Sequence, residues 1–488
     1  MRDLLKSAAA LVLLALPANA QDAITLGMVL EPPNLDPTGG AAAATDEVVY
    51  ANVFEGLTRF GPNGTIEPAL AERWDVENNG RTYVFHLHDG VSFHDGAAFD
   101  AGDVVFTLDR ARAPGSTNAQ KVLFQGIEAV EALDPLTVRV TLAAPDGNFP
   151  FKMAWGDAVM LDPASASSLA TTPVGTGPFR FDRWVQGDRI VLSAFDGYWG
   201  EKPALKTATF RFIPDPSAAF AAVMAGDVDA FPNYPAPETL PQLQADPRFK
   251  VMVGTTEGET ILAMNNARAP LNDIKVRQAI AHAINRADII DGAMFGYGTP
   301  IGSHFAPHHP DYVDLTGLSD HDPEKAKALL AQAGVGPIAL RLALPPTPYA
   351  RRGGEIVQAQ LAAVGIQTRI DNMEWAQWLE TVFKNGDFDL TVISHTEPLD
   401  IDIYARPDYY FRYARPEFVA LMDRLQAAVT PQQRGDLYKQ AQEMIARDHV
   451  NAFLFQLAKT GVADARIEGL WENAPTQAND LTKVRWIP

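Results

Sequence analysis

The chain has 488 residues, which is long enough for two or three lobes and too long for one ordinary core. Its composition, 47% hydrophobic and 20% charged, is typical of a globular protein. A formal net charge of -20 argues against a nucleic-acid partner, because phosphate backbones are recognised by basic surfaces. The absence of cysteine excludes disulfides, thiolate metal sites and a cysteine nucleophile.

The amino terminus has the three parts of a secretory signal. Arg2 and Lys6 give a positive start, residues 8–16 form an apolar run, and Ala18-Asn19-Ala20 is a small-x-small cleavage site. The run is too short to span a bilayer. We therefore expect residues 1–20 to be removed and the mature chain to be released into the periplasm. It is not expected to be a lipoprotein, since no cysteine is available for lipid attachment.

Several elements can be predicted in chain order. Alternating apolar residues at 24–30 predict a strand, and residues 41–57 have a helical pattern. Asn78-Asn79-Gly80 predicts a hairpin turn before a strand at 82–87, because Asn and Gly tolerate positive φ. Asp100 is a predicted N-cap for a helix that runs to about Ala111.

An ordered phrase surrounds these elements and carries a family resemblance. It consists of Trp74, the aromatic strand residues Tyr83 and Phe85, the tetrad Phe93-His94-Asp95-Gly96, and the helix residues Ala101, Asp103, Val104 and Val105. The phrase resembles the extracytoplasmic solute-binding proteins of peptide and nickel ABC importers, family 5, which includes dipeptide- and oligopeptide-binding proteins.

Further phrases of the same family follow in the expected order, so the resemblance covers nearly the whole mature chain. They are VGTGPF at 174–179, YWG at 198–200, AGDVD at 225–229, VRQAI at 276–280 and AINR at 283–286. Gly175 and Gly177 are predicted to allow a chain crossing close to another backbone. They are not a phosphate loop, because no Gly-Lys-Ser/Thr follows.

The resemblance implies an α/β periplasmic binding protein of the venus-flytrap type, with two lobes, a hinge and an extra third domain. Lobe I would comprise residues 21–67, 171–260 and 461–488. The extra domain would comprise 68–170, and lobe II 261–460. The two chain crossings, near residues 256–263 and near Thr460, would act as hinges.

One stretch stands out as a candidate binding loop. Residues 395–411, HTEPLDIDIYARPDYYF, follow a predicted buried strand at 388–393 and combine carboxylates with aromatic rings. Apolar walls with a few placed charges suit a small cationic or zwitterionic solute. The alternative is an acidic surface turn followed by an aromatic edge strand. The candidate ligand-binding residues in this stretch are Glu397, Asp400, Tyr409 and Tyr410; if the tyrosines lie on a strand, only one can face the cleft.

Glu397 is the candidate anchor. In dipeptide-binding relatives an acid in this loop pairs with the α-ammonium of the solute, and the resemblance puts Glu397 at its position. The alternative is that Glu397 caps a turn. Weaker candidates for the pocket are Glu31 on the first loop, Asn233 and Tyr234 after the 225–229 turn, and Trp155, which also suits a domain core.

The same relatives place an arginine for the peptide carboxylate near Pro346 or Thr347, where this chain has none. Arg351 and Arg352 follow closely, but they open an amphipathic helix and can equally be solvated or paired. A longer peptide would explain the loss. So would a solute with a cation and no carboxylate.

The sequence gives weaker indications of a metal site or a catalytic site than of a solute-binding site. His86 and His88 share one face of a predicted strand. Together with His94 and Asp95 they could ligate a single metal ion. His94-Asp95 belongs to the family phrase, however, so we expect no metal and no cofactor. His308 and His309 lie in a Pro-rich loop and are predicted to be surface residues. No hydrolase or nucleotide-binding pattern is visible, so the protein is not expected to be an enzyme.

The predicted function is that of the periplasmic solute-binding component of an ABC importer, which captures a peptide or peptide-like amine and delivers it to the permease subunits in the inner membrane. The alternatives are another nutrient, such as an opine, an oligosaccharide or chelated nickel, or an enzyme or chaperone acting on exported proteins. A monomer is the usual state of such receptors.

Overall fold

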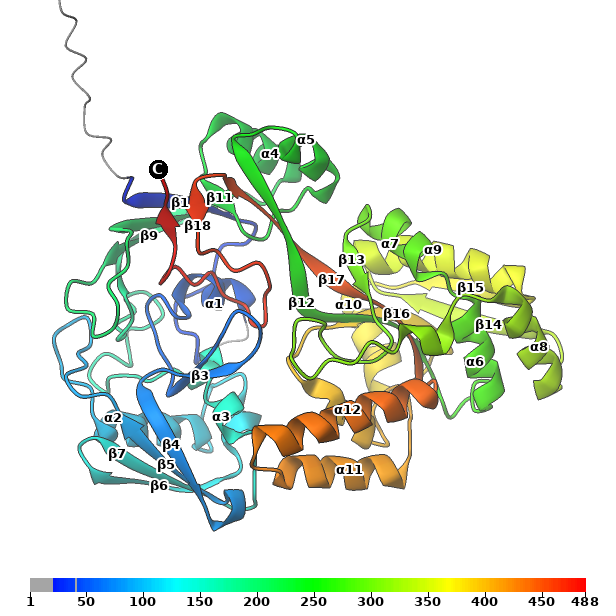
Figure 1. Cartoon of the computed structure of the whole chain (residues 1–488), viewed down its shortest axis with the longest axis horizontal. Coiled ribbons are helices and arrows are strands. Elements are labelled where there is room, and N and C mark those ends of the chain that lie inside the picture. The colour runs from blue at the N-terminus through cyan, green and yellow to red at the C-terminus, as the bar shows by residue number, and fades with distance from the viewer. Residues whose placement is uncertain (1–20, 40–41) are drawn as a thin grey trace, which may run out of the picture.

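The computed structural model describes residues 21–39 and 42–488, apart from the side chains at 348, 375 and 376. The predicted signal peptide, residues 1–20, lies outside the described residues. Two lobes are joined by two long strands, β12 (Phe249–Met264) and β17 (Asn451–Asp464), which run side by side between them (Figure 1). The two strands pair antiparallel along their length, with a shift of register between Thr255 and Glu259.

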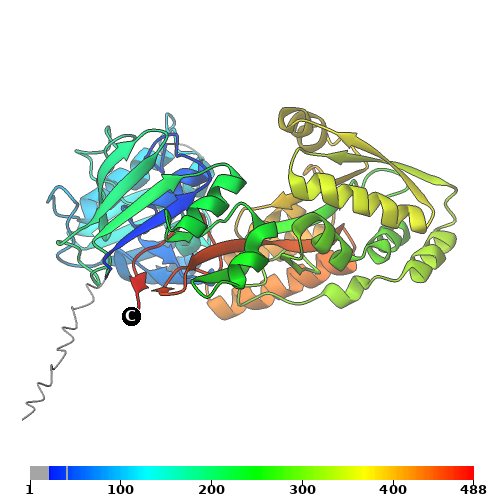
Figure 2. The ribbon, with the colours of Figure 1, turned by 90° about the horizontal axis from the view of Figure 1, so that it is seen from above.

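One 11-stranded sheet extends through both lobes by way of this strand pair, in the order β15-β14-β16-β12-β17-β11-β1-β10-β9-β8, with β13 (Gly298–Pro300) added beside β17. Its first-lobe strands are β1 (Ala23–Met28), β8 (Phe179–Val185), β9 (Arg189–Ala194), β10 (Thr207–Phe212) and β11 (Ala230–Phe231). Its second-lobe strands are β14 (Ile338–Leu344), β15 (Ile366–Asn372) and β16 (Leu390–His395). Seen from above, the two ends form separate bodies (Figure 2).

A smaller antiparallel sheet lies beside the first lobe. Its order is β4 (Ala71–Glu77), β5 (Thr82–Leu87), β7 (Thr137–Leu142), β6 (Ile127–Asp134), and helix α2 (Ala101–Arg112) packs on it. The predicted hairpin is confirmed, since Asn78, Asn79 and Gly80 all have positive φ. The predicted cap is also confirmed. Asp100 accepts from the Gly102 amide, and the Asp103 carboxylate accepts from the Asp100 amide at 2.9 Å.

Helices cover the second-lobe end of the large sheet and form a hairpin toward the first lobe (Figure 1). The covering helices are α6 (Ile274–Ala283), α7 (Arg286–Met294), α8 (Pro323–Ala333) and α9 (Pro348–Ala363), and the hairpin is α11 (Pro416–Ala427) with α12 (Pro431–Arg447). Leu342, Val357 and Val392 are completely buried between sheet and helices. These apolar contacts hold the helices on the sheet, because a helix or the sheet by itself would expose its apolar face to water.

The remaining α-helices and β-strands have ten residues or fewer. They are α1 (Ala43–Val49), β2 (Thr58–Phe60), β3 (Ile66–Pro68), α3 (Phe149–Lys152), α4 (Pro216–Ala225), α5 (Leu240–Gln244), α10 (Trp375–Trp378), β18 (Ile467–Glu468) and β19 (Arg485–Trp486). The prediction of a helix over 41–57 was too long, because the chain leaves the helix after Val49 and Ala51 adopts a φ of 58°. No helix of the described residues is long and apolar enough to cross a membrane.

Two glycines are required where the chain crosses itself. A Cβ added at Gly175 would overlap the carbonyl oxygen of Val53, and one added at Gly177 would overlap that of Asn52. The predicted close approach of two backbones is therefore confirmed.

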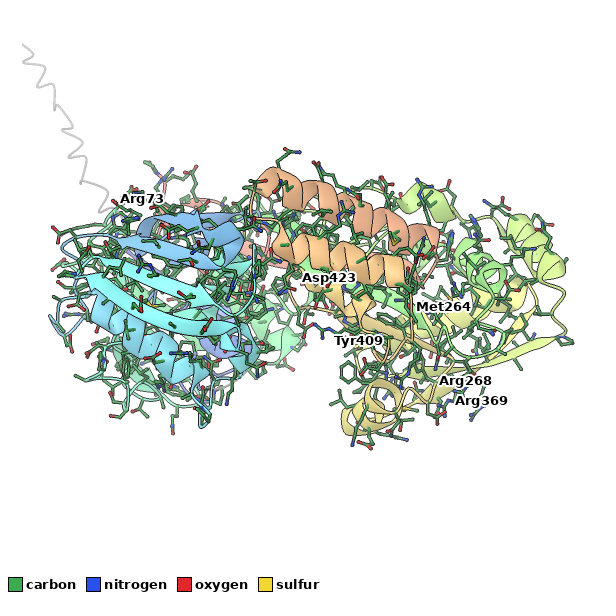
Figure 3. The ribbon with its side chains drawn as sticks, turned by 90° about the horizontal axis from the view of Figure 1, so that it is seen from below. Arg73, Met264, Arg268, Arg369, Tyr409 and Asp423 are labelled. Atoms are coloured by element: carbon green, nitrogen blue, oxygen red, sulfur yellow. The ribbon has the colours of Figure 1, made fainter. Side chains whose placement is uncertain are left out.

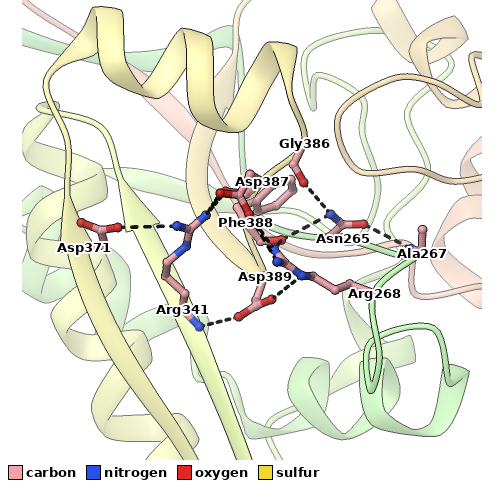
Figure 4. Close-up of polar contacts among 9 residues, drawn as sticks. All are labelled: Asn265, Ala267, Arg268, Arg341, Asp371, Gly386, Asp387, Phe388 and Asp389. Carbon is pink, nitrogen blue, oxygen red and sulfur yellow. Dashed lines mark hydrogen bonds and ion pairs between the residues drawn. The ribbon is translucent and has the colours of Figure 1, made fainter.

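An ion-pair cluster fixes the start of β16 (Figure 4). Arg268 contacts Asp387 and Asp389 at 3.3 Å, and the Arg341 amide donates to the Asp389 carboxylate at 2.7 Å. Arg341 also approaches Asp371 on β15. These contacts tie β14, β15 and the entry to β16 together, so the residues that leave the other end of β16 have a fixed origin.

Candidate functional site

A cavity of about 820 Å³ lies between the lobes. On the side of the first lobe it is lined by residues of the predicted extra domain, Asp146, Asn148, Phe151, Lys152 and Trp155. Its second-lobe side includes residues 393–403, Arg406, Tyr409 and part of α11. Figure 3 shows Tyr409 and Asp423 on the side of the second lobe that faces the first. A cavity of this size suits a small organic molecule, and its walls come from both sides of the molecule.

Strand β16 leads directly into the residues that form the second-lobe wall of the cavity. It is almost wholly buried, pairs antiparallel with β12 and ends at His395. The chain then turns at Leu399, which has a φ of 55°, and continues as a 3-10 helix, Asp400–Ala405. Because the turn follows the strand end directly, residues 394–403 reach the cavity from a rigid origin.

The charges around the cavity are mostly negative. Five carboxylates line it, on Asp146, Glu397, Asp400, Asp402 and Asp423, against the side chains of Lys152 and Arg406 and the ring of His395. Lys152 lies 2.6 Å from Asp146, and Arg406 lies 2.7 Å from Asp402. Within the described part of the chain, Glu397 and Asp423 form no ion pair. The cavity therefore has anionic groups left over for a cation.

Glu397 is exposed at this wall. Its Oε2 accepts a hydrogen bond of 3.2 Å from the amide of Thr396, the neighbouring residue. The carboxylate thus contacts the turn, as the capping alternative expects, while its side chain lines the cavity, as an anchor requires. Its role as an anchor stays a prediction.

A polar cluster extends from this wall into the second lobe, with Asp400 and His395 in the cavity lining and His304 buried behind them. Asp400 Oδ1 is 2.7 Å from His304 Nε2, and Asp400 Oδ2 is 3.6 Å from His395 Nδ1. The far nitrogen of each ring meets a tyrosine hydroxyl. His304 Nδ1 lies 3.2 Å from Tyr404, and His395 Nε2 lies 3.0 Å from Tyr410. Asp400 is therefore held between two imidazoles whose other sides are also fixed.

The electrostatics of the cluster are those of a buried anion with nearby partners. Burial alone would raise the pKa of Asp400, but the two facing imidazoles outweigh it and hold that pKa well below its usual range. Burial raises the pKa of Glu259, and the charges of Glu257 and Asp400 raise it further. Glu259 is 3% exposed, and its Oε2 has no hydrogen-bond partner among the described residues.

The structure brings four of the predicted site residues together. Glu397, Asp400, Tyr409 and Trp155 all line the cavity. Tyr410 does not; it is 1% exposed and contacts His395 from behind. The aromatic pair lies in a turn after the 3-10 helix, not on an edge strand, yet only one of the two rings reaches the cavity lining.

The other three predicted residues lie outside the cavity lining and have partners within the first lobe. Glu31 accepts from Trp184 Nε1 and from the Gly187 amide, both at 2.9 Å. Asn233 donates to Glu47 at 2.9 Å. Tyr234 is buried, with its hydroxyl 2.7 Å from that of Thr239.

The three histidines of the possible metal site in the small sheet domain each contact a different partner. His86 lies 2.8 Å from Asp75, and His88 packs on Trp199 with ring centroids 4.4 Å apart. His94 contacts the Gly177 carbonyl at 2.9 Å and accepts from the Gly175 amide.

The prediction that His308 and His309 are surface residues was wrong. The His308 ring bridges Thr255 and Glu257 beside the connecting strands, each at 2.7 Å, and the His309 ring packs on Phe305. Their Pro-rich loop folds inward, so that the His308 ring packs beside the part of β12 where the register shifts. The local sequence does not indicate this inward fold.

The two arginines considered for a solute carboxylate are engaged elsewhere. Arg351 donates to the carbonyls of Pro345 and Met373, and Arg352 stacks over the Phe295 ring. Neither lines the cavity. His304 and His395 were missed by sequence reasoning. His395 sits at a strand end, which is a weak signal, but His304 lies in a loop with nothing to link it to Asp400, 96 positions away.

Two lobes, a paired-strand crossover and a charged, aromatic-walled cavity between the lobes define a two-lobed solute-binding protein. The family described as bacterial extracellular solute-binding proteins, family 5 Middle, matches residues 65–413, and the chain belongs to this family.

Individual proteins are similar to this chain in sequence or in fold. The dipeptide-binding protein of Escherichia coli (strain K12) is 30% identical over 466 residues, covering 86% of each chain. The structure of HbpA2 from Haemophilus parasuis has a TM-score of 0.86 at 24% identity and covers 96% of this chain and 100% of its own. The periplasmic binding protein DppA from Helicobacter pylori, in complex with the peptide STSA, has a TM-score of 0.74 at 25% identity and covers 96% of this chain and 98% of its own.

Proposed function

We propose that this chain is the periplasmic solute-binding component of an ABC importer and that it captures a peptide or peptide-like amine. The observation that carries the proposal is the cavity between the lobes, where the carboxylates of Glu397 and Asp423 lack a cation among the described side chains. The names of the dipeptide-binding and peptide-bound relatives support a peptide as the solute. The chain performs no chemistry on the solute.

Glu397 is the proposed anchor for the ammonium group. Its carboxylate stands at the end of a buried strand, so a bound amine would meet a fixed charge. A charge-assisted hydrogen bond to a desolvated ammonium contributes about 1.5 to 3 kcal/mol. Trp155 and Tyr409 supply aromatic walls from opposite lobes, which favours closure around a solute with an apolar body.

The solute carboxylate is not held by a dedicated arginine in this proposal. Among the described residues, Arg406 is the one arginine in the cavity lining, and Asp402 already pairs with it. The chain would therefore accept longer peptides, or amines without a carboxylate. Export with cleavage after Ala20, a monomeric state and delivery to a membrane permease complete the proposal, together with the domain boundaries predicted above.

The test is titration calorimetry with a peptide panel, each peptide also supplied with its amino group acetylated. We expect acetylation to abolish binding, and Glu397→Gln to weaken it about tenfold to a hundredfold. Asp423→Asn is the matched control, because it removes one negative charge from the same cavity and should cost much less. Equal binding of free and acetylated peptides, or by wild type and Glu397→Gln, would contradict the anchor. Mass spectrometry of co-purified solute tests the peptide class independently.

A further inference from the structure

The His304, His395 and Asp400 cluster has the composition of a transition-metal site. Each residue offers one ligand atom, and these three atoms lie within 4.8 Å of one another. Ligands held about 2 Å from one ion in a tetrahedral shell are about 3.3 Å apart. His304 Nε2 lies 2.7 Å from Asp400 Oδ1 and His395 Nδ1 lies 3.6 Å from Asp400 Oδ2, distances on either side of that value, so both imidazoles already approach the carboxylate as ligands of one ion would.

The second layer of contacts also fits a metal. A ligating histidine needs its other ring nitrogen held by a hydrogen bond, which fixes the ring and its tautomer. Tyr404 and Tyr410 occupy those positions, and Asn451 in turn donates to the Tyr404 hydroxyl at 3.1 Å. A tyrosine hydroxyl can donate or accept, so each ring can place its proton on the far side and present a lone pair to an ion.

A second, independent observation is the unsatisfied carboxyl group of Glu259. It lies directly opposite His395 in the β12–β16 ladder, so the two side chains share one face of the sheet. It is buried with one oxygen unpartnered, and Glu257, two residues before it, is a second buried carboxyl group that is paired with His308 at 2.7 Å. Burying such groups together is costly unless positive charge is nearby. A dication at the cluster would supply that charge.

We infer that His304, His395 and Asp400 form a direct binding site for one first-row transition-metal dication, such as Zn²⁺, Ni²⁺ or Co²⁺. Two imidazoles and a carboxylate select these ions over Ca²⁺ and Mg²⁺, which prefer oxygen ligands only. His395 and Asp400 also line the interlobe cavity, so the open coordination positions face the solute space. The site departs from the absence of metal that the sequence predicts, and it does not depend on which solute the chain carries.

The test uses the full chain, stripped with a chelator and dialysed against Zn²⁺, Ni²⁺ or Co²⁺ alone. Elemental analysis should find one ion per chain, and the Co²⁺ form should show visible absorption bands of a nitrogen- and oxygen-ligated ion. His395→Gln and Asp400→Asn should each lower affinity at least tenfold. His86→Gln is the matched control, because His86 forms a His–Asp pair at 2.8 Å with no third ligand, and it should leave affinity unchanged.

Folding of each variant is checked by its melting temperature without metal. If a ligand variant does not fold, electron paramagnetic resonance of the Cu²⁺-loaded wild type decides, since two coupled imidazole nitrogens are expected. Substoichiometric binding, no nitrogen coupling, or full affinity in folded Asp400→Asn would overturn the site. Because no peptide is present, these outcomes are separate from the fate of the proposed solute.

Discussion

The guanidinium of Arg434 on α12 donates a hydrogen bond of 2.7 Å to the backbone carbonyl of Gly147, in the predicted extra domain on the first-lobe side. The Gly147 amide in turn donates to the Gln426 carbonyl at 2.8 Å, and Asn148 contacts the Tyr438 hydroxyl. These contacts lie near α3 and α12, away from β12 and β17 (Figure 1). The lobes are thus joined in two places, covalently through the long strands and non-covalently beside the cavity.

We predict that Arg434→Ala shifts the chain toward a more open arrangement. Loss of one hydrogen bond from a half-buried guanidinium costs about 1 kcal/mol, which changes the open-to-closed ratio about fivefold. Small-angle X-ray scattering should show a larger radius of gyration than for wild type. Arg447→Ala, on the same helix but paired with its helix neighbour Glu443, is the control. An unchanged scattering curve for Arg434→Ala would show that the contact does not hold the lobes.

The pairing of Arg406 with Asp402 predicts a change in solute preference. In Asp402→Asn the guanidinium keeps its place in the cavity lining but loses its carboxylate partner at 2.7 Å. We expect the preference for peptides with a free terminal carboxylate over their amides to rise about threefold, a modest value because both side chains are half exposed to solvent. The measurement is the ratio of the two dissociation constants. Adding Arg406→Gln should cancel the gain; a ratio that does not move in Asp402→Asn would contradict the prediction.

His94 predicts a pH dependence of stability. Burial lowers the pKa of His94 to about 4, from an ordinary value of 6.5. The ring must stay neutral to accept from the Gly175 amide while donating to the Gly177 carbonyl. Between pH 6.5 and pH 4 the His94 side chain is protonated in the unfolded chain but neutral in the folded chain. The contribution of the neutral His94 ring to stability is therefore present above pH 6.5 and is lost as the pH falls toward 4.

The size of this effect is on the order of 3 kcal/mol at most. Chemical denaturation at pH 7 and pH 4.5 should show that His94→Gln loses less unfolding free energy on acidification than wild type does, because Gln cannot titrate. Parallel losses in wild type and His94→Gln would refute the assignment.

The sequence by itself determined those features of the protein that depend on the conformational preferences of neighbouring residues. The hairpin at Asn78–Gly80, the strand Thr82–Leu87 and the Asp100 cap follow from the backbone preferences of neighbouring residues, and each is present. The glycines at 175 and 177 indicate a tight crossing because only glycine fits there. The family was visible in the spacing of such phrases. The predicted buried strand marked residues 395–411 as a candidate loop, and the family resemblance singled out Glu397 within it, whose role as an anchor stays a prediction.

Tertiary structure alone decided which distant side chains meet. The pairing of β12 with β16 puts Glu259 beside His395, and an inward fold of the 304–309 loop brings His304 to Asp400 and His308 to Glu257. The turn after Ala405, and not a strand, put Tyr409 in the cavity lining and Tyr410 behind it. Such contacts depend on strand register and on packing across many intervening residues, and no local preference encodes them.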